Sequence, residues 1–360
     1  MARPILATLS TENLLHNIRV ISEKVRPASV IAMVKSNAYG HGIRSTAMRL
    51  EGHVAMFGVA SIDEALILDS ISLTTSILLA EGVFDAQELI VASEKSFHVV
   101  FHDYKQLEWL EVTTLPFPIH AWLKINTGMG RLGFAVDEAQ MVYERLCAST
   151  NTRKPIRVMS HFACADMVGH VLSDRQIAAF SRFKNTITDT QYSFCNSAAL
   201  FKYPELHYNY VRVGIAMYGV SPFSDITAHD LGLRPVMTFA TKLISVKTLP
   251  KGANIGYGAR YTCPETMPVG VIACGYGDGY PITARDGTPL LINGVRCPLI
   301  GRVSMDMMAV DLRGNPEAQV GDRVVMWGEG LPLEEVVVHT SEIVWNMLTN
   351  IQLRVKFYWS

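Results

Sequence analysis

The sequence contains no pair of cysteines at the spacing of a metal or redox site. Three of its cysteines lie within apolar runs, where cysteine behaves as a small hydrophobic residue. We therefore expect free thiols, no bound metal and a reducing compartment. The six cysteines are scattered and form no C-x-x-C motif: Cys147, Cys164, Cys195, Cys263, Cys274 and Cys297.

Long apolar runs are also missing, although 49% of the 360 residues are hydrophobic and only 18% are charged. The chain is therefore predicted to be a soluble globular protein that is long enough for two domains. Its first residues, MARPILATLS, carry one arginine and no sustained apolar segment before the polar TENLLHN. We expect neither a signal peptide nor a membrane anchor, and hence a cytoplasmic protein.

Neither sign of charge is in excess. Lysine and arginine total 32, aspartate and glutamate total 33, and no basic block stands out. Binding to nucleic acid or to an anionic membrane surface would need such a block. The charge pattern therefore indicates a small-molecule ligand and no nucleic acid or membrane partner.

The first part of the chain alternates strand-like and helix-like runs, after an opening helix whose Leu14, Ile18, Ile21 and Val25 share one face. Continuous hydrophobicity in the strand-like runs is typical of parallel strands that are buried on both faces. Eight such units in about 220 residues predict an α/β fold, an eight-stranded (α/β) barrel, with a doubly wound open sheet as the alternative. The eight runs are SVIAMVKS, MFGVAS, SILLAEG, HVVFHD, PIHAWLKIN, IRVMSHFAC, QYSFCNS and YVRVGIAMYG.

The pattern changes from about residue 221 onward. The segment SPFSDITAHDLGLRP is a polar connector, and beyond it the runs are rich in Val, Ile and Thr and are punctuated by Gly, Pro and Asn-Gly. We therefore expect the barrel over residues 1–230 and a mainly β C-terminal domain over residues 231–360.

Unusual residues gather at the expected carboxyl ends of the barrel strands, where barrel enzymes place their chemistry. One polar residue at a strand end is ordinary, but agreement among five strands favours a shared site. The residues are Lys35 after the first strand; Lys124, Asn126 and Arg131 after the fifth; His161 in the sixth; Asn196 and Ser197 at the end of the seventh; and Arg212, Gly214 and Ile215 in and after the eighth.

Lys35 stands at the end of the apolar run VIAMVK. An apolar setting disfavours the charged amine, which frees its lone pair to attack a carbonyl and form a Schiff base. A lysine that merely extends into solvent is the alternative. The Ser197 hydroxyl and the N–H groups of Gly214 and Ile215 can form a phosphate site, which favours pyridoxal phosphate or a sugar-phosphate aldolase.

Eight motifs, in order over nearly the whole chain, resemble those of the alanine racemase family, which are fold-type III pyridoxal-phosphate enzymes. They are AMVKSNAYGHG, LKINTGMGRLGF, SHFACAD, CNSAAL, VRVGIAMYG, IGYGARY, GYGDGYP and GRVSMDM. The resemblance implies an (α/β) barrel, a β-rich second domain and a homodimer. In that dimer the subunits pair head to tail, and each active site borrows the β domain of the partner.

The resemblance also assigns roles within the barrel. Lys35 would hold pyridoxal 5'-phosphate as a Schiff base, and Arg212 would face the pyridine nitrogen. Because a guanidinium cannot deliver a proton to that nitrogen, the ring would be a weaker electron sink, which favours racemisation over transamination. The residues implied to contact the cofactor are Lys35, Tyr39, Arg131, His161, Asn196, Ser197, Arg212, Gly214 and Ile215.

Racemisation needs one base on each face of the α carbon. The resemblance implies Lys35 for one face and Tyr257 of the partner subunit for the other. A phenol has a reference pKa of about 10 and needs help to act as a base near neutrality. A hydrogen-bond chain through His161 toward Arg212 would supply that help.

The remaining implied residues surround the substrate, L-alanine or D-alanine. Arg131 would bind its carboxylate, and Met305 and Asp306 would line the pocket beside Tyr276. Lys124 can be carbamylated in this resemblance and would then orient Arg131, the alternative being a plain lysine paired with an acid. The product would supply peptidoglycan with D-alanine or enter alanine catabolism.

One position departs from the family pattern. The tyrosine that reaches the cofactor phosphate near the C-terminus is replaced by Trp345 in the best register. An indole can donate but cannot accept a hydrogen bond. Three other classes remain as alternatives: a barrel decarboxylase for basic amino acids, a non-catalytic pyridoxal-phosphate carrier and a sugar-phosphate aldolase.

Overall fold

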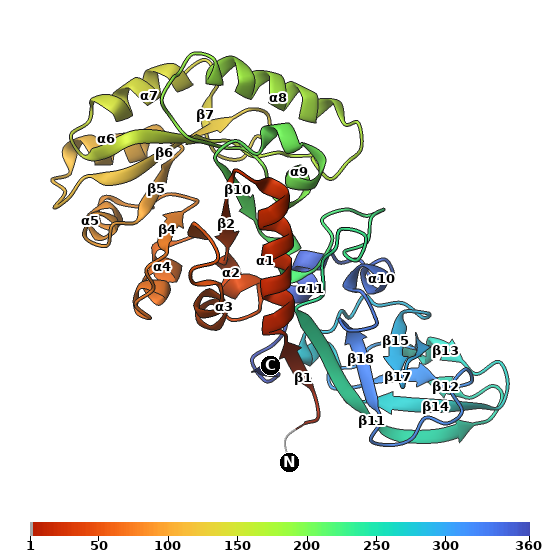
Figure 1. Ribbon diagram of the computed structural model, residues 1–360. Helices are drawn as coiled ribbons and strands as arrows, with labels where there is room; N and C mark the ends of the chain where they lie inside the picture. The colour runs from red at the N-terminus through yellow and green to blue at the C-terminus, as the bar shows by residue number, and fades with distance from the viewer. Residues whose placement is uncertain (1–2) are drawn as a thin grey trace. The chain divides into compact units, whose positions relative to one another are not determined.

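The computed structural model describes residues 3–360, which form two compact units (Figure 1). The barrel unit comprises residues 18–217 and 222–225. The β unit comprises the described residues up to Asn17, together with residues 218–221 and 226–360. The six cysteines are free thiols, as predicted. No helix in residues 3–360 is long and apolar enough to cross a bilayer.

Eight parallel strands close into a barrel in the barrel unit, which confirms the predicted fold class and excludes the open sheet. Neighbours pair in chain order, and the last strand pairs with the first through Arg212 and Ile31. A ninth short strand, β7 (Phe134–Ala135), pairs only with β6. The barrel strands are β2 (Ser29–Met33), β3 (Met56–Val59), β4 (Ser76–Leu79), β5 (His98–Phe101), β6 (Ile119–Asn126), β8 (Thr152–Met159), β9 (Tyr192–Ser193) and β10 (Tyr210–Val213).

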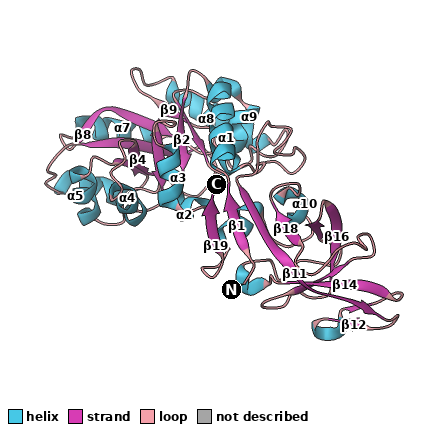
Figure 2. Ribbon diagram, turned by 60° about the horizontal axis from the view of Figure 1, so that its bottom comes forward, coloured by secondary structure: helices cyan, strands magenta, loops and turns pink. Residues whose placement is uncertain are grey.

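Helices connect the barrel strands and group around them, as Figure 2 shows. Side chains cap several of these helices, for example Asp85 and Asp103, which accept hydrogen bonds from first-turn N–H groups. The helices of the barrel region are α1 (Thr11–Val25), α2 (Lys35–Tyr39), α3 (Ile43–Leu50), α4 (Ile62–Asp69), α5 (Ala86–Glu94), α6 (Tyr104–Val112), α7 (Ala139–Ala148), α8 (Val171–Lys184), α9 (Ser197–Lys202), η1 (Pro204–Leu206) and η2 (Ile215–Tyr218).

The barrel interior has an apolar middle layer. Side chains alternate along each strand, so every second residue points inward. The inward residues of the middle layer form one buried cluster: Ile31, Met33, Met56, Leu78, Val100, Trp122 and Met159. This layer is what the continuous apolar runs of the sequence encode.

Two strands end earlier than the sequence runs suggested. β2 ends at Met33, so Lys35 begins the next element. β8 ends at Met159, which pairs with Lys124 of β6, and His161 lies in the loop that follows. The placement of His161 inside the sixth strand was therefore wrong, because the chain leaves the barrel wall once its pairing with β6 and β9 ends.

The β unit is built on an antiparallel sheet in which β11 also pairs with β14, so that six strands complete a closed circuit. Figure 2 shows that strands dominate this unit. Its elements are β1 (Leu6–Leu9), β11 (Met237–Leu249), β12 (Asn254–Ile255), η3 (Tyr257–Ala259), β13 (Tyr261–Thr262), β14 (Met267–Ile272), η4 (Tyr276–Asp278), β15 (Pro289–Ile292), β16 (Val295–Ile300), β17 (Met308–Asp311), β18 (Arg323–Trp327), α10 (Leu333–Val337), α11 (Val344–Thr349) and β19 (Lys356–Trp359).

The N-terminal strand belongs to the β unit. β1 pairs antiparallel with β11, Leu6 opposite Ala240, and parallel with β19, Leu6 opposite Lys356. Sequence analysis counted residues 1–230 as barrel. The sequence of a four-residue strand does not indicate a partner more than 200 residues away. Only the observed pairing with β11 and β19 places β1 in the β unit.

The middle layer yields a stability prediction. Leu78→Ala removes a fully buried side chain from the barrel interior and should lower the free energy of unfolding by about 2–5 kcal/mol, because a cavity remains. Leu66→Ala on α4 removes the same atoms from an exposed side chain and should change stability by less than about 0.5 kcal/mol. Urea denaturation of both variants measures the difference, and equal losses would contradict the layer assignment.

Candidate active site

Lys35 opens a left-handed turn at the carboxyl end of β2. Residues 36–39 have φ values of 52–55°, a conformation that costs roughly 1–2 kcal/mol for each residue with a side chain. Glu64 supports the turn, since its carboxylate accepts hydrogen bonds from the backbone N–H of Ser36 at 2.7 Å and of Ala60 at 2.8 Å. A strained turn held by tertiary contacts is typical of functional sites.

The Lys35 amine forms an ion pair with Glu81, which follows β4. Lys35 Nζ lies 3.2 Å from Glu81 Oε1, and both side chains are about one third exposed. Sequence reasoning did not single out Glu81, although its place directly after an apolar strand is the same signal that marked Lys35. The pair orients the amine at the barrel mouth.

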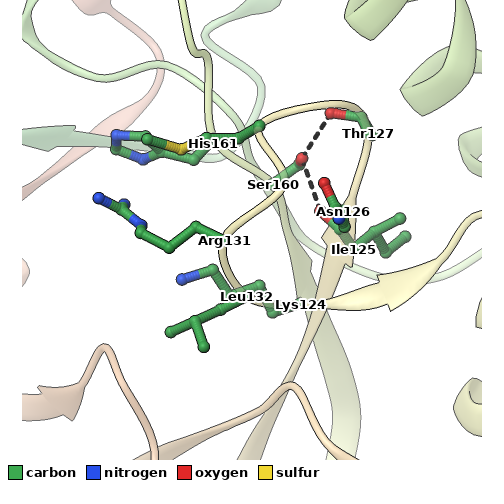
Figure 3. Close-up of a pocket in the computed structure, with 9 residues that line it drawn as sticks. Lys124, Ile125, Asn126, Thr127, Arg131, Leu132, Ser160 and His161 are labelled. Atoms are coloured by element: carbon green, nitrogen blue, oxygen red, sulfur yellow. Dashed lines mark hydrogen bonds between the residues drawn. The ribbon is translucent and has the colours of Figure 1, made fainter.

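The loop after β6 carries Arg131 and is shaped by Asn126. The Asn126 Oδ1 accepts hydrogen bonds from the N–H groups of Gly128 and Gly130 at 3.1 and 3.0 Å. Asn126 was predicted as a site residue, and the structure shows it acting on its own loop. Its neighbour Thr127 meets Ser160 at 2.8 Å (Figure 3).

Gln176 of α8 joins this loop to the segment that carries His161. Its amide Nε2 donates to Thr127 Oγ1 at 3.2 Å and to the His161 carbonyl at 2.8 Å. Its Oε1 accepts from Ala163 N–H at 2.9 Å, and the side chain is fully buried. Sequence analysis missed Gln176, because one glutamine within a helix gives no signal of what it contacts.

A pocket at the carboxyl end of the barrel collects cationic side chains. In Figure 3 Arg131, Lys124 and His161 extend toward the same side. Burial, Arg212 and Arg131 together lower the pKa of Lys124 to about 8. Among the described residues the Lys124 amine has no hydrogen-bond or ion-pair partner. The pocket is lined by Lys124, Ile125, Asn126, Thr127, Met129, Arg131, Leu132, Ser160 and His161.

Arg212 of β10 is 6% exposed, and its guanidinium is held by several hydrogen bonds. Its Nη1 donates to the carbonyl and hydroxyl of Ser193 at 3.0 and 2.7 Å, and its Nη2 donates to the Ser160 carbonyl. Burial lowers the pKa of Arg212 to about 10, which leaves it charged at neutral pH. Its Nε–H has no partner within residues 3–360 and remains available to a ligand.

His161 receives a hydrogen bond from Arg212. The distance from Arg212 Nη2 to His161 Nδ1 is 3.0 Å, and a guanidinium can only donate, so Nδ1 accepts and the ring proton sits on Nε2. Burial, then the charges of Arg212 and Lys124, hold the pKa of His161 well below its usual value. The ring is therefore neutral at pH 7 and presents an N–H donor.

A small cradle lies where β9 and β10 end. Ser197, the first residue of α9, accepts a hydrogen bond at its Oγ from Gly214 N–H at 3.0 Å, and Asn196 caps the helix through Ala199 N–H at 3.0 Å. A Cβ on Gly214 would meet the Tyr39 hydroxyl at 2.3 Å. Only glycine permits this approach, which brings together three predicted residues.

The remaining predicted residues, Tyr257, Tyr276, Met305 and Asp306, lie in the β unit. Tyr257 lies on η3 and is 73% exposed. The segments of Tyr276 and Met305 are joined through their backbones, since Tyr276 N–H donates to the Ser304 carbonyl at 3.0 Å and Gly277 N–H donates to the Met305 carbonyl at 2.8 Å. Trp345 on α11 is partly exposed.

Asp278 ties Arg3, Arg354 and the turn before Tyr276 to one another. Sequence analysis did not predict this residue. Its carboxylate is fully buried and lies 2.8 Å from Arg3 Nη2 and 2.7 Å from Arg354 Nε. Arg354 also reaches Asp306 at 2.7 Å. Asp278 further accepts a hydrogen bond from Gly275 N–H at 3.0 Å, which fixes the turn before Tyr276.

A closed parallel barrel with a lysine and a cationic pocket at its carboxyl end, attached to a β-rich unit, has the architecture of a fold-type III enzyme. The family profile described as "Alanine racemase, N-terminal domain" matches residues 9–222, and that described as "Alanine racemase, C-terminal domain" matches residues 236–359. The chain belongs to the alanine racemase family, whose members generally depend on pyridoxal phosphate.

Individual relatives match over almost the full length. The chain is 40% identical over 357 residues to an alanine racemase of Legionella pneumophila, covering 99% of this chain and 100% of the relative. It is 41% identical over 356 residues to one of Coxiella burnetii, covering 98% and 97% of the two chains. The crystal structure of the biosynthetic alanine racemase from Pseudomonas aeruginosa superposes with a TM-score of 0.96 at 37% identity, covering 99% of each chain.

The buried carboxylate yields a second prediction. Asp278→Asn leaves Arg3 and Arg354 without their buried counter-charge and should lower the free energy of unfolding by roughly 2–4 kcal/mol. Glu317→Gln removes the same charge from an exposed position and should leave stability unchanged. Thermal and urea unfolding of both variants give the comparison, and an unaffected Asp278→Asn protein would contradict the role.

Proposed function

We propose that the chain interconverts L-alanine and D-alanine, with pyridoxal phosphate held at the carboxyl end of the barrel. The observation that carries this proposal is the set of cations around one amine: Lys35 on its strained turn, with Lys124, Arg131 and Arg212 nearby. Burial is the largest cause that lowers the pKa of Lys124; the charges of Arg212, Arg131 and Lys35 lower it further, and Glu81 acts against them. The cationic pocket favours an anionic cofactor and an amino acid carboxylate.

The donors present fit the proposed cofactor. Tyr39, Ser197 and the backbone N–H groups of Gly214 and Ile215 would hold its phosphate, since the close approach of Tyr39 to Gly214 leaves donors and little bulk in the cradle. Lys35 would hold it through the amine. The chemistry that the bound cofactor supplies is electron withdrawal from the α carbon of an amino acid, which acidifies the α proton.

Arg212 would face the pyridine nitrogen with its unused Nε–H. Three contacts, to Ser193, Ser160 and His161, fix the guanidinium in place. It can donate a hydrogen bond but cannot give up its proton at neutral pH. Electron withdrawal is thereby restrained, which suits prompt return of a proton to the α carbon.

Two groups would move the α proton, one on each face. Lys35 would serve one face, and Tyr257 of a second copy of the chain would serve the other. The neutral His161, with its proton on Nε2, would donate to the phenolic oxygen and stabilise its anionic form. The exposure of Tyr257 supports a role toward another subunit, in a homodimer with shared sites.

The substrate carboxylate would bind Arg131, with Met305, Asp306 and Tyr276 closing the pocket from the second subunit. We further propose that Lys124 is carbamylated. A pKa of about 8 leaves part of this amine neutral near pH 7, and a neutral amine is the form that reacts with carbon dioxide. The resulting anion would pair with Arg131 and orient it.

The proposal predicts the effect of removing the amine. Lys35→Ala should lower racemisation by at least about 10³-fold and abolish the visible absorbance that stays with the protein after desalting. Lys105→Ala, on the exposed face of α6, should change neither property. Activity is followed by the chirality of alanine, and a fully active Lys35→Ala protein would overturn the proposed function.

The shared site predicts complementation. If Lys35→Ala and Tyr257→Phe proteins are unfolded, mixed equally and refolded, half of the dimers are mixed and half of their sites are intact. Activity should therefore recover to about a quarter of the wild-type value. Each variant refolded alone is the control. Failure to recover, in a preparation shown by mass to contain mixed dimers, would mean that Tyr257 serves its own chain.

A further inference from the structure

The amino-terminal end of the barrel carries a second polar layer. It consists of His98 at the start of β5, His120 in β6, Arg157 in β8, Gln191 before β9 and Tyr210 at the start of β10. Along β6 the inward alternation runs from this layer through the apolar middle layer to the cationic pocket. His120 and Lys124, four residues apart, are separated by roughly 13 Å.

The contacts in this layer fix two rings and one guanidinium. The His98 and His120 rings stack at 4.3 Å between centroids with planes 9° apart. The Trp122 indole Nε1 donates to His98 Nδ1 at 3.1 Å, so the His98 ring carries its proton on Nε2. Arg157 Nε donates to Gln191 Oε1 at 2.8 Å.

The layer holds more donors than acceptors. Arg157 Nη1 is buried and has no hydrogen-bond partner in residues 3–360. Tyr210 also donates to Gln191, at 3.3 Å, so that acceptor is already shared. A buried guanidinium N–H without an acceptor costs free energy, which an anionic ligand would recover.

Within residues 3–360, no carboxylate is among the groups that shift the pKa of His98 or His120. Burial, His120 and Arg157 lower the pKa of His98 to about 3, and burial, Arg157 and Arg153 lower the pKa of His120. Every charge acting on the two rings is positive, and Arg157 forms no ion pair in the part of the chain that the structure describes. His120, Arg157 and Tyr210 are partly exposed, so the layer borders solvent, although Arg157 Nη1 itself is covered.

We propose that this amino-terminal mouth binds a small oxyanion of the phosphate class. Arg157 donates to it through its guanidinium, whose buried Nη1 lacks an acceptor, and the His120 imidazole donates from the neighbouring strand β6. The site is distinct from the cradle at Ser197 and Gly214, because the buried middle layer with Trp122 and Met159 lies between them. Both sites are in the barrel unit, and the proposal does not depend on the proposed function.

The test uses the intact protein after saturation with pyridoxal phosphate, whose phosphate would fill the cradle at Ser197 and Gly214. Inorganic phosphate, titrated at constant ionic strength against chloride, should raise the melting temperature in a saturable manner. Arg157→Gln should weaken phosphate binding at least tenfold in calorimetric titration. The control is Arg145→Gln, because Arg145 forms an ion pair with Glu111 on α6. This variant should bind phosphate as tightly as the wild type does.

Two further variants separate the explanations. Gly214→Ala alters the cradle and should leave phosphate binding at the amino-terminal mouth intact. His120→Asn, at a partly exposed position, tests the site if Arg157→Gln does not fold, and should also weaken binding. Equal effects of phosphate and chloride on the wild type, or phosphate binding that survives in both Arg157→Gln and His120→Asn, would overturn the proposal.

Discussion

Concentrated positive charge at the carboxyl end of a parallel barrel is the constraint on which this structure depends. Arg212 is buried there and satisfies its Nη donors with the Ser193 and Ser160 carbonyls and with His161. Burial first, and then the charge of Arg212, lower the pKa of His161 and of Lys124. Burial and neighbouring positive charge together therefore set the protonation of these groups, which gives a pocket of basic residues distinct chemical roles.

The site is held by residues that position other residues, one of which, Asn126, also lines the pocket. Glu64 supports the left-handed turn after Lys35, Asn126 shapes the loop that carries Arg131, and Gln176 joins that loop to the segment of His161. Each of these side chains forms a hydrogen bond with a backbone group of the segment that it holds: Ser36 N–H, Gly128 N–H and the His161 carbonyl. Positioning of this kind keeps the reacting groups within the small tolerance that catalysis requires.

The barrel separates two polar ends with one apolar layer. Trp122 and Met159 fill its middle, so the cationic pocket and the histidine layer are electrostatically and sterically distinct. Such a division follows from strand alternation, since residues two apart on one strand point inward at successive levels. In the β unit, the buried Asp278 carboxylate forms ion pairs with Arg3 and Arg354 and accepts a hydrogen bond from the turn before Tyr276.

The sequence by itself determined the eight strands, the β-rich second part and most of the candidate site, because parallel strands leave continuous apolar runs and barrel chemistry follows strand ends. Lys35, Arg131, Ser197 and Arg212 were predicted in this way, and they lie in or after the carboxyl ends of barrel strands. Tertiary structure alone decided the left-handed turn, the Glu81 ion pair, the role of Gln176, the pairing of β1 with β11 and the polar layer at His98. Each of these rests on contacts between residues distant in the chain, and local composition carries no record of such contacts.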